Sequence, residues 1–195
     1  MNNPINITKP PVMPLAQNVV STSNRPTRPG TVILLDPSPY PEVKGNHDPA
    51  TVAMLKNDYA GLVSELTAIT QYIFQNNSSD DETFANAMLQ IAISEMQHLD
   101  LLGDAIHTLG GTTEFTDGNH RFWTAANVNY ANDRAGMLRA NIQAEQAAIA
   151  NYERHAAATS NESVRRLLLR IADDERLHLK FFEEQLAKLQ HGGQG

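Results

Sequence analysis

The chain has 195 residues, 41% of them hydrophobic, and a formal net charge of −7, which suits one well-cored globular domain. The acidic balance argues against a nucleic-acid-binding protein, and the absence of cysteine excludes disulfides, zinc–thiolate sites, iron–sulfur centres and a thiol nucleophile. No run approaches the roughly 20 apolar residues of a membrane helix, and the first residues do not resemble a secretory signal. We therefore expect a cytoplasmic protein that binds neither nucleic acid nor membranes.

The N-terminal part of the chain differs sharply in composition from the rest. All ten prolines fall between Pro4 and Pro49, and proline disrupts helix interiors. Residues 1–47 are therefore predicted to form an extended Pro-rich arm, followed by a helical domain at 48–190 and a flexible tail at 191–195. We favour an arm that wraps around its own helices, because Tyr40 and the apolar run Val32–Leu35 would otherwise be exposed; disorder is the alternative.

Two helices are predicted between the arm and residue 109. Asp48 before Pro49 is typical of a helix start, and the first helix should run over about 49–76, with Leu62 and Ile69 on its apolar face. The pattern Ser79-Asp-Asp-Glu82 is a capping box, which predicts a second helix over about 79–109. These two helices would form the first hairpin.

The second half of the chain predicts a long connection and two more helices. Residues 110 to about 130 show no periodicity and are too long for a hairpin turn, so they should cross from one end of a bundle to the other. Within them, Phe122 and Trp123 are expected to form an apolar plug. Helices follow over about 132–157 and 161–189, which gives an all-α four-helix bundle with its long crossover between the second and third helices.

A repeat relates the two hairpins. Glu95-x-x-His98 and Glu175-x-x-His178 are the only two sequences of this form, and they lie 80 residues apart (175 − 95). Each has a glutamate 30 residues upstream, Glu65 in the first hairpin and Glu145 in the second. On a helix, residues three apart share a face, so each Glu-x-x-His pair presents a carboxylate beside an imidazole.

These glutamates interrupt stripes that are otherwise apolar. A buried carboxylate without a partner is costly, and four facing one core would repel one another. Two metal ions would remove both problems, with the histidines as neutral ligands. An oxygen-rich site with one histidine per ion suits iron or manganese better than structural zinc. The predicted catalytic and metal-ligating residues are Glu65, Glu95, His98, Glu145, Glu175 and His178.

Three further residues are expected to support these ligands. Tyr72 and Tyr152 each lie seven residues after an upstream glutamate, which is two helical turns along the same face. We interpret them as hydrogen-bond donors to ligand carboxylates, although each could equally be a core tyrosine with one partner. Asp174 could orient a ligand histidine, or it could be a solvated residue at the edge of its helix.

The segments around Glu65–Tyr72, Ser94–His98, Glu145 and Asp174–His178 resemble the rubrerythrin and bacterioferritin branch of the ferritin-like superfamily. Pro39–Val43 and Gln71–Gln75 are also similar to manganese catalases. The resemblance covers about residues 39–189. It implies a di-metal carboxylate centre that reacts with O₂ or H₂O₂, in which Glu95 and Glu175 bridge the metals while Glu65 and Glu145 are terminal ligands.

Several features of the sequence differ from those usual in these families and limit the functions that we expect. The cysteine-rich module usual in rubrerythrins is absent, and Ile142 and Ala148 stand where those proteins place an extra carboxylate. Met96 occupies the position of the haem-binding methionine of bacterioferritins, but we interpret it as a packing residue and do not expect haem. Only a few residues follow the fourth helix, which disfavours a ferritin cage; we expect a homodimer by analogy with the fold.

The leading hypothesis for function is therefore an oxidoreductase with two iron ions. It would act as a rubrerythrin-like peroxidase or a ferroxidase on H₂O₂ or O₂, the peroxidase with an external electron donor. A manganese catalase with two manganese ions is the first alternative. A non-enzymatic metal-binding protein, such as a spore-coat-type structural protein, is the second.

Overall fold

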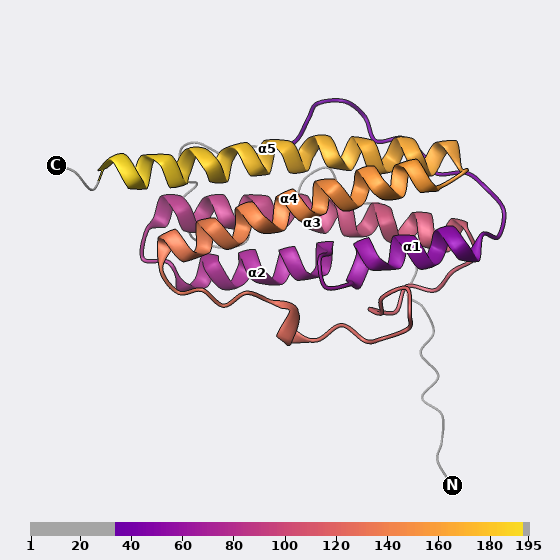
Figure 1. Cartoon of the computed structure of the whole chain (residues 1–195), viewed down its shortest axis with the longest axis horizontal. Coiled ribbons are helices and arrows are strands. Elements are labelled where there is room, and N and C mark those ends of the chain that lie inside the picture. The colour runs from indigo at the N-terminus through magenta and orange to yellow at the C-terminus, as the bar shows by residue number, and fades with distance from the viewer. Residues whose placement is uncertain (1–33, 193–195) are drawn as a thin grey trace, which may run out of the picture. The chain divides into compact units, whose positions relative to one another are not determined.

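A computed structural model describes residues 34–192, so most of the predicted arm and the last residues of the tail lie outside the described residues. The described part contains five α-helices and one short 3₁₀ helix (Figure 1). These elements are α1 (Pro49–Ala60), α2 (Glu65–Ser78), α3 (Glu82–Thr108), η1 (Ala125–Asn127), α4 (Arg134–Ala158) and α5 (Glu162–Gly192).

The helices form a four-helix bundle, as predicted. The position of its first helix, the first leg, is occupied by α1 and α2 together (Figure 1). The closest packing is within the two hairpins, α2 against α3 and α4 against α5. Two apolar clusters fill the bundle; one includes Leu102 and Ile171, the other Met88 and Phe182. Along α3 and α5, Glu95 and Glu175 fall between these clusters, so the acidic residues occupy a layer inside the core.

The first leg is not the continuous helix that the sequence predicted, because the chain breaks at residues 61–64. The Gly61 amide still donates to the carbonyl of Asn57 (2.9 Å), and a Cβ at Gly61 would lie only 2.4 Å from that oxygen. Ser64 then caps α2 by accepting a hydrogen bond from the amide of Thr67 (3.3 Å). This local capping overrides the helical period, and Leu62, predicted to be buried, is 70% exposed.

The segment before α1 packs onto the bundle where it is described. Tyr40 and Val43 contact one apolar cluster and Leu34 contacts the other. The backbone amide of Lys44 donates to Ser163 Oγ on α5 (2.9 Å). Asp48 caps α1 by accepting from the amide of Thr51 (3.0 Å), with Pro49 at the first helical position as predicted.

The crossover between α3 and α4 follows the first leg of the bundle. Asn57 on α1 accepts from the amide of Gly118 (3.0 Å), and Gln71 on α2 accepts from the amide of Asn129 (3.0 Å). Of the two residues predicted to form an apolar plug, only Trp123 packs against an apolar cluster. Trp123 donates its indole N–H to Thr67 (2.9 Å), whereas Phe122 is 75% exposed. Within residues 34–192, the helices all fall short of the combined length and apolarity needed to span a membrane.

Candidate metal centre

The six predicted ligands converge at one level of the bundle, and each is at most 3% exposed. Their ligand atoms form two groups whose members lie within 4.8 Å of one another. One group is Glu65, Glu95, His98 and Glu175, and the other is Glu95, Glu145, Glu175 and His178. Glu95 and Glu175 belong to both groups, so the two candidate cation positions share their carboxylates.

Each histidine turns its Nδ1 atom toward the carboxylates. His98 Nδ1 lies 2.9 Å from Glu95 Oε2 and 3.3 Å from Glu175 Oε1. His178 Nδ1 lies 2.9 Å from Glu175 Oε2 and 3.0 Å from Glu95 Oε1. Each imidazole thus faces the glutamate of its own motif and that of the repeated motif, which is the geometry of one nitrogen ligand at each of two positions.

Without cations, burial and the mutual repulsion of the carboxylates favour the protonated forms of several groups in the layer. Burial raises the pKa of Glu65 and of Glu145 well above the usual value, and the carboxylates of Glu175 and Glu95 raise it further. Burial alone would lower the pKa values of His98 and His178, but the surrounding carboxylates raise both well above normal. The buried carboxylates therefore strongly favour positive charge within the layer, from protons or from metal cations.

The donor set fits a pair of divalent or trivalent cations. Glu65 Oε2 is buried without a hydrogen-bond partner among the described residues, so its lone pairs are available inside the layer. Four carboxylates and two imidazoles form a mostly oxygen donor set, which suits iron or manganese.

The two predicted supporting tyrosines reach across the bundle reciprocally. The Tyr72 hydroxyl on α2 donates to Glu145 Oε1 on α4, and the Tyr152 hydroxyl on α4 donates to Glu65 Oε1 on α2. Burial raises the pKa of both phenols well above the usual value, and the nearby carboxylates add to the effect. Both tyrosines therefore remain protonated donors, and each fixes one oxygen of a glutamate.

Asp174 lies behind His98, with its Oδ2 atom 3.1 Å from His98 Nε2. Burial alone would raise the pKa of this carboxyl, but hydrogen bonds from His98, Tyr40 and Arg170 lower it. The structure thus places Asp174 against a predicted ligand histidine and not on a solvated helix edge, since the residue is 0% exposed.

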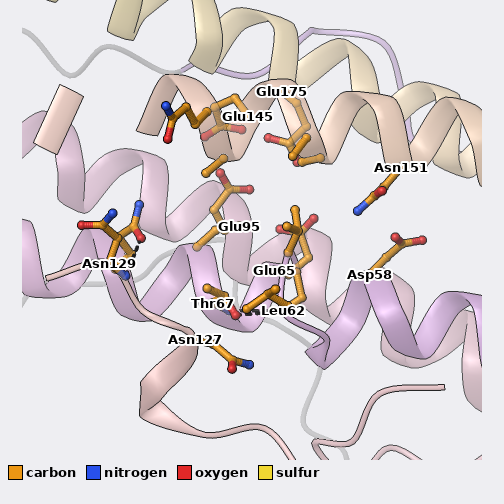
Figure 2. Close-up of a pocket in the computed structure, with 18 of the residues that line it drawn as sticks. Asp58, Leu62, Glu65, Thr67, Glu95, Asn127, Asn129, Glu145, Asn151 and Glu175 are labelled. Atoms are coloured by element: carbon orange, nitrogen blue, oxygen red, sulfur yellow. Dashed lines mark hydrogen bonds between the residues drawn. The ribbon is translucent and has the colours of Figure 1, made fainter. Parts of the chain in front are cut away.

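A cavity of about 410 Å³ opens onto this layer between α2 and α4. Figure 2 shows the four glutamates gathered at the cavity, with Asn127 and Asn129 of the crossover to one side. Neither His98 nor His178 is among the lining residues. Leu62 from the break in the first leg also lines the cavity and is largely exposed, so the cavity extends from the glutamates to the surface at this break.

A buried ionisable pair that the sequence did not predict lies beside the cavity. Asp58 on α1 lines the cavity wall, and its Oδ2 atom lies 2.7 Å from His155 Nδ1 on α4. Burial raises the pKa of Asp58, an effect that His155 partly offsets. Neither residue belongs to the 80-residue repeat of the Glu-x-x-His pairs, so no sequence signal linked them.

This pair leads to a stability prediction. Replacing His155 with alanine should lower the free energy of unfolding by about 3–5 kcal/mol, because it leaves a buried carboxylate without its partner. The deficit should grow as pH rises, because loss of His155 removes an interaction that lowers the pKa of Asp58. The folded pKa of Asp58 is then higher in the variant than in the wild type, and the variant loses more stability as pH rises through it. Urea denaturation at pH 5 and pH 8 measures both effects. R139A, at an exposed arginine of the same helix, is the control, and a loss in H155A no larger than in R139A would contradict the prediction.

Comparison with known proteins agrees with this architecture. The model of the ferritin-like domain family matches residues 52–191. A probable manganese catalase of Clostridium acetobutylicum is 25% identical over 167 residues, covering 75% of this chain and 74% of the relative. The structure of KatB, a manganese catalase from Anabaena PCC7120, superposes with a TM-score of 0.74 at 26% identity, covering 80% of each chain.

A second kind of relative shares the bundle. The bacterioferritin of Desulfovibrio desulfuricans, whose structure contains a diiron site, superposes with a TM-score of 0.64 at 26% identity, covering 75% of this chain and 84% of that chain. The family match extends over most of the bundle, and the layer of buried glutamates and histidines lies within the matched residues. The chain therefore belongs to the ferritin-like di-metal carboxylate superfamily.

Proposed function

We propose that this protein binds two manganese ions at the six residues of the buried layer and disproportionates hydrogen peroxide. One observation carries the proposal: the similarity to two manganese catalases covers about three-quarters or more of both chains in each comparison. The sequence alone favoured two iron ions and a rubrerythrin-like peroxidase or a ferroxidase. Similarity to the manganese catalases shifts our preference to manganese.

The proposed ligands divide into two positions. Glu65 and His98 belong to one, Glu145 and His178 to the other, and Glu95 and Glu175 are shared. When bound, the ions would supply the two-electron redox chemistry by which one peroxide is oxidised and a second is reduced. Two molecules of H₂O₂ then give one O₂ and two H₂O, and no external electron donor is needed.

The side chains of this chain support that reaction in three ways. Tyr72 and Tyr152 hold one oxygen each of Glu145 and Glu65, which limits the positions the carboxylates can adopt. Neutral amides at the cavity, such as Asn127 and Asn151, offer hydrogen bonds to a small uncharged molecule. Asp58 is the one ionisable lining residue, among those described, outside the four glutamates and two tyrosines, so it is placed to hold a proton released by peroxide.

Oxygen evolution tests the proposal. Metal-free protein reloaded with manganese should release one O₂ for every two H₂O₂ without any reductant, measured with an oxygen electrode. The variant E184A, which changes an exposed glutamate of α5, should match the wild type. Peroxide consumption by manganese-loaded protein without O₂ release would contradict the proposal.

Iron is the second candidate, because the bacterioferritin relative contains a diiron site. Iron-loaded protein that consumes peroxide only with an added reductant would favour the peroxidase. Iron(II) oxidation by O₂ would favour the ferroxidase. Stoichiometric metal binding without turnover under either condition would favour a non-enzymatic metal-binding protein.

A further inference from the structure

The outer nitrogen of His98 has a charged partner. Because His98 Nδ1 faces the glutamates, the outward atom is Nε2, which lies 3.1 Å from Asp174 Oδ2. An N–H at Nε2 donates to that carboxylate, which leaves the Nδ1 lone pair for a cation. Such a carboxylate fixes the orientation of a ligand histidine and raises its basicity.

Asp174 is itself fixed by partners on both of its carboxylate oxygens. Oδ2 also accepts from the Tyr40 hydroxyl (2.6 Å) and lies 2.7 Å from Arg170 Nη1. Oδ1 accepts from the backbone amide of Asp36 (2.6 Å). Because the residue is 0% exposed, these donors replace water around the buried negative charge, which would otherwise be costly.

Residues 36–40 pack against Arg170 and the outer side of His98 from outside the bundle. Arg170 on α5 donates to the carbonyls of Ser38 (2.8 Å) and Asp36 (2.5 Å). Its guanidinium lies 4.3 Å from the centre of the Tyr40 ring, and that ring meets the His98 ring edge-on at 6.1 Å. The segment therefore fixes Asp174 and the outer side of His98 together.

The outer nitrogen of His178 has a different environment. His178 Nε2 is buried with no hydrogen-bond partner among residues 34–192. The residue that matches Asp174 in the 80-residue repeat is Ser94 (174 − 94), and its Oγ atom is likewise buried without a partner in the described part of the chain. A neutral hydroxyl thus stands where the other half of the repeat has a carboxylate.

We propose that the two metal positions have unequal affinities, with the position at His98 binding its ion more tightly than the position at His178. Asp174, held by segment 36–40, is the positioning residue responsible. The inference rests on the proposed two-metal centre and adds an order of filling to it. Loss of a residue that supports a ligand histidine typically costs about 10–100-fold in metal affinity, which sets the size of the expected difference.

Variants with one histidine removed isolate each position. H178A keeps the His98 position and H98A keeps the His178 position, so cooperativity between the two ions does not enter the comparison. Titration of metal-free protein with Mn²⁺ alone, followed by calorimetry and by the electron paramagnetic resonance signal of free Mn²⁺, gives each Kd. We expect Mn²⁺ to bind H178A about 10–100-fold more tightly than H98A. Equal affinities would overturn the inference.

A second substitution identifies Asp174 as the cause. D174N preserves the size of the side chain but removes its charge. It should weaken Mn²⁺ binding in the H178A background by about 10–100-fold and leave the H98A background nearly unchanged. Y40F should weaken the same position by less, and Y130F, which changes an exposed tyrosine of the crossover, is the matched control. If D174N weakened both backgrounds equally, its role would be structural and the inference would be wrong.

Installing the missing charge is the converse test. S94D in the H98A background should tighten Mn²⁺ binding, provided that thermal unfolding shows the variant to be folded. Because Mn²⁺ binding is measured directly, a wild type that binds two ions without evolving O₂ would contradict the proposed function and leave this comparison intact. If wild-type protein bound no Mn²⁺, both proposals would be wrong.

Discussion

Replacing Glu95 and Glu175 together with alanine is expected to abolish stoichiometric binding of both metal ions. Each of these glutamates belongs to both ligand groups, so the double variant leaves each position with one glutamate and one histidine. Elemental analysis after loading and gel filtration should fall from about two ions per chain to about none, because ligand count largely determines affinity. O₂ evolution from H₂O₂ should be lost with the ions.

A comparison with E65A makes this experiment specific. Glu65 belongs to the group of His98 alone, so E65A should keep the ion at the His178 position. The double variant should also fold, since it removes two of the carboxylates that raise the pKa values of Glu65 and Glu145 by repulsion. E184A again serves as the surface control. Two ions still bound by the folded double variant would show that the site has been assigned to the wrong residues.

The sequence predicted the bundle and the composition of its acidic layer because both depend on periodic patterns. Helical spacing located α3, α4 and α5 to within a few residues. The repeated Glu-x-x-His pairs indicated which polar residues face inward, since a carboxylate in an apolar stripe needs a partner. The cap of α3 was predicted less well: Asp81, two residues after Ser79, accepts the hydrogen bond from the amide of Phe84.

The parts that the sequence did not predict depend on single residues and on contacts between distant segments. A helical period runs through Gly61 and Ser64, yet a close backbone approach and a capping hydrogen bond divide the leg there. Asp58 and His155 are 97 residues apart, and Tyr40 is 134 residues from Asp174. Such pairs have no periodicity, so only the folded chain reveals them.

The difference between His98 and His178 shows how a repeat can mislead. The two halves of the sequence match in glutamates, histidines and tyrosines, which suggests two equivalent metal positions. The folded chain adds segment 36–40, which meets Asp174 and thus the outer side of His98. The equivalence of the repeat is therefore lost at the residues behind the ligands.

Removal of the metal ions should lower the melting temperature markedly. An ion that binds only the folded state stabilises it by about 4 kcal/mol when its concentration is 1,000 times Kd, and a domain of this size loses about 2–4 °C per kcal/mol. Chelation followed by dialysis should therefore lower the melting temperature by about 10 °C or more. The measurement is circular dichroism or calorimetry of metal-free and reloaded protein, with metal content verified. Identical melting curves would contradict a core metal site.

The effect of chelation should increase with pH. In the metal-free protein, the folded-state pKa values of Glu65 and Glu145 are raised above the usual 4.5, so stability falls as pH rises through them. The raised pKa values of His98 and His178 act in the same direction, since the stability they contribute below the usual 6.5 is lost as pH rises through the folded values. The pKa of Glu175 is lowered, so its contribution is lost only as pH falls below the ordinary range.

Between about pH 5 and pH 8 the metal-free protein should thus become less stable, whereas metal binding strengthens because the ligands must be deprotonated. The difference in melting temperature between reloaded and metal-free protein should therefore be larger at pH 8 than at pH 5.5. The E95A/E175A variant is the control, because adding metal should leave its melting temperature unchanged at both pH values. A difference that shrinks as pH rises would show that the buried glutamates and histidines are not the groups whose protons the metal ions displace.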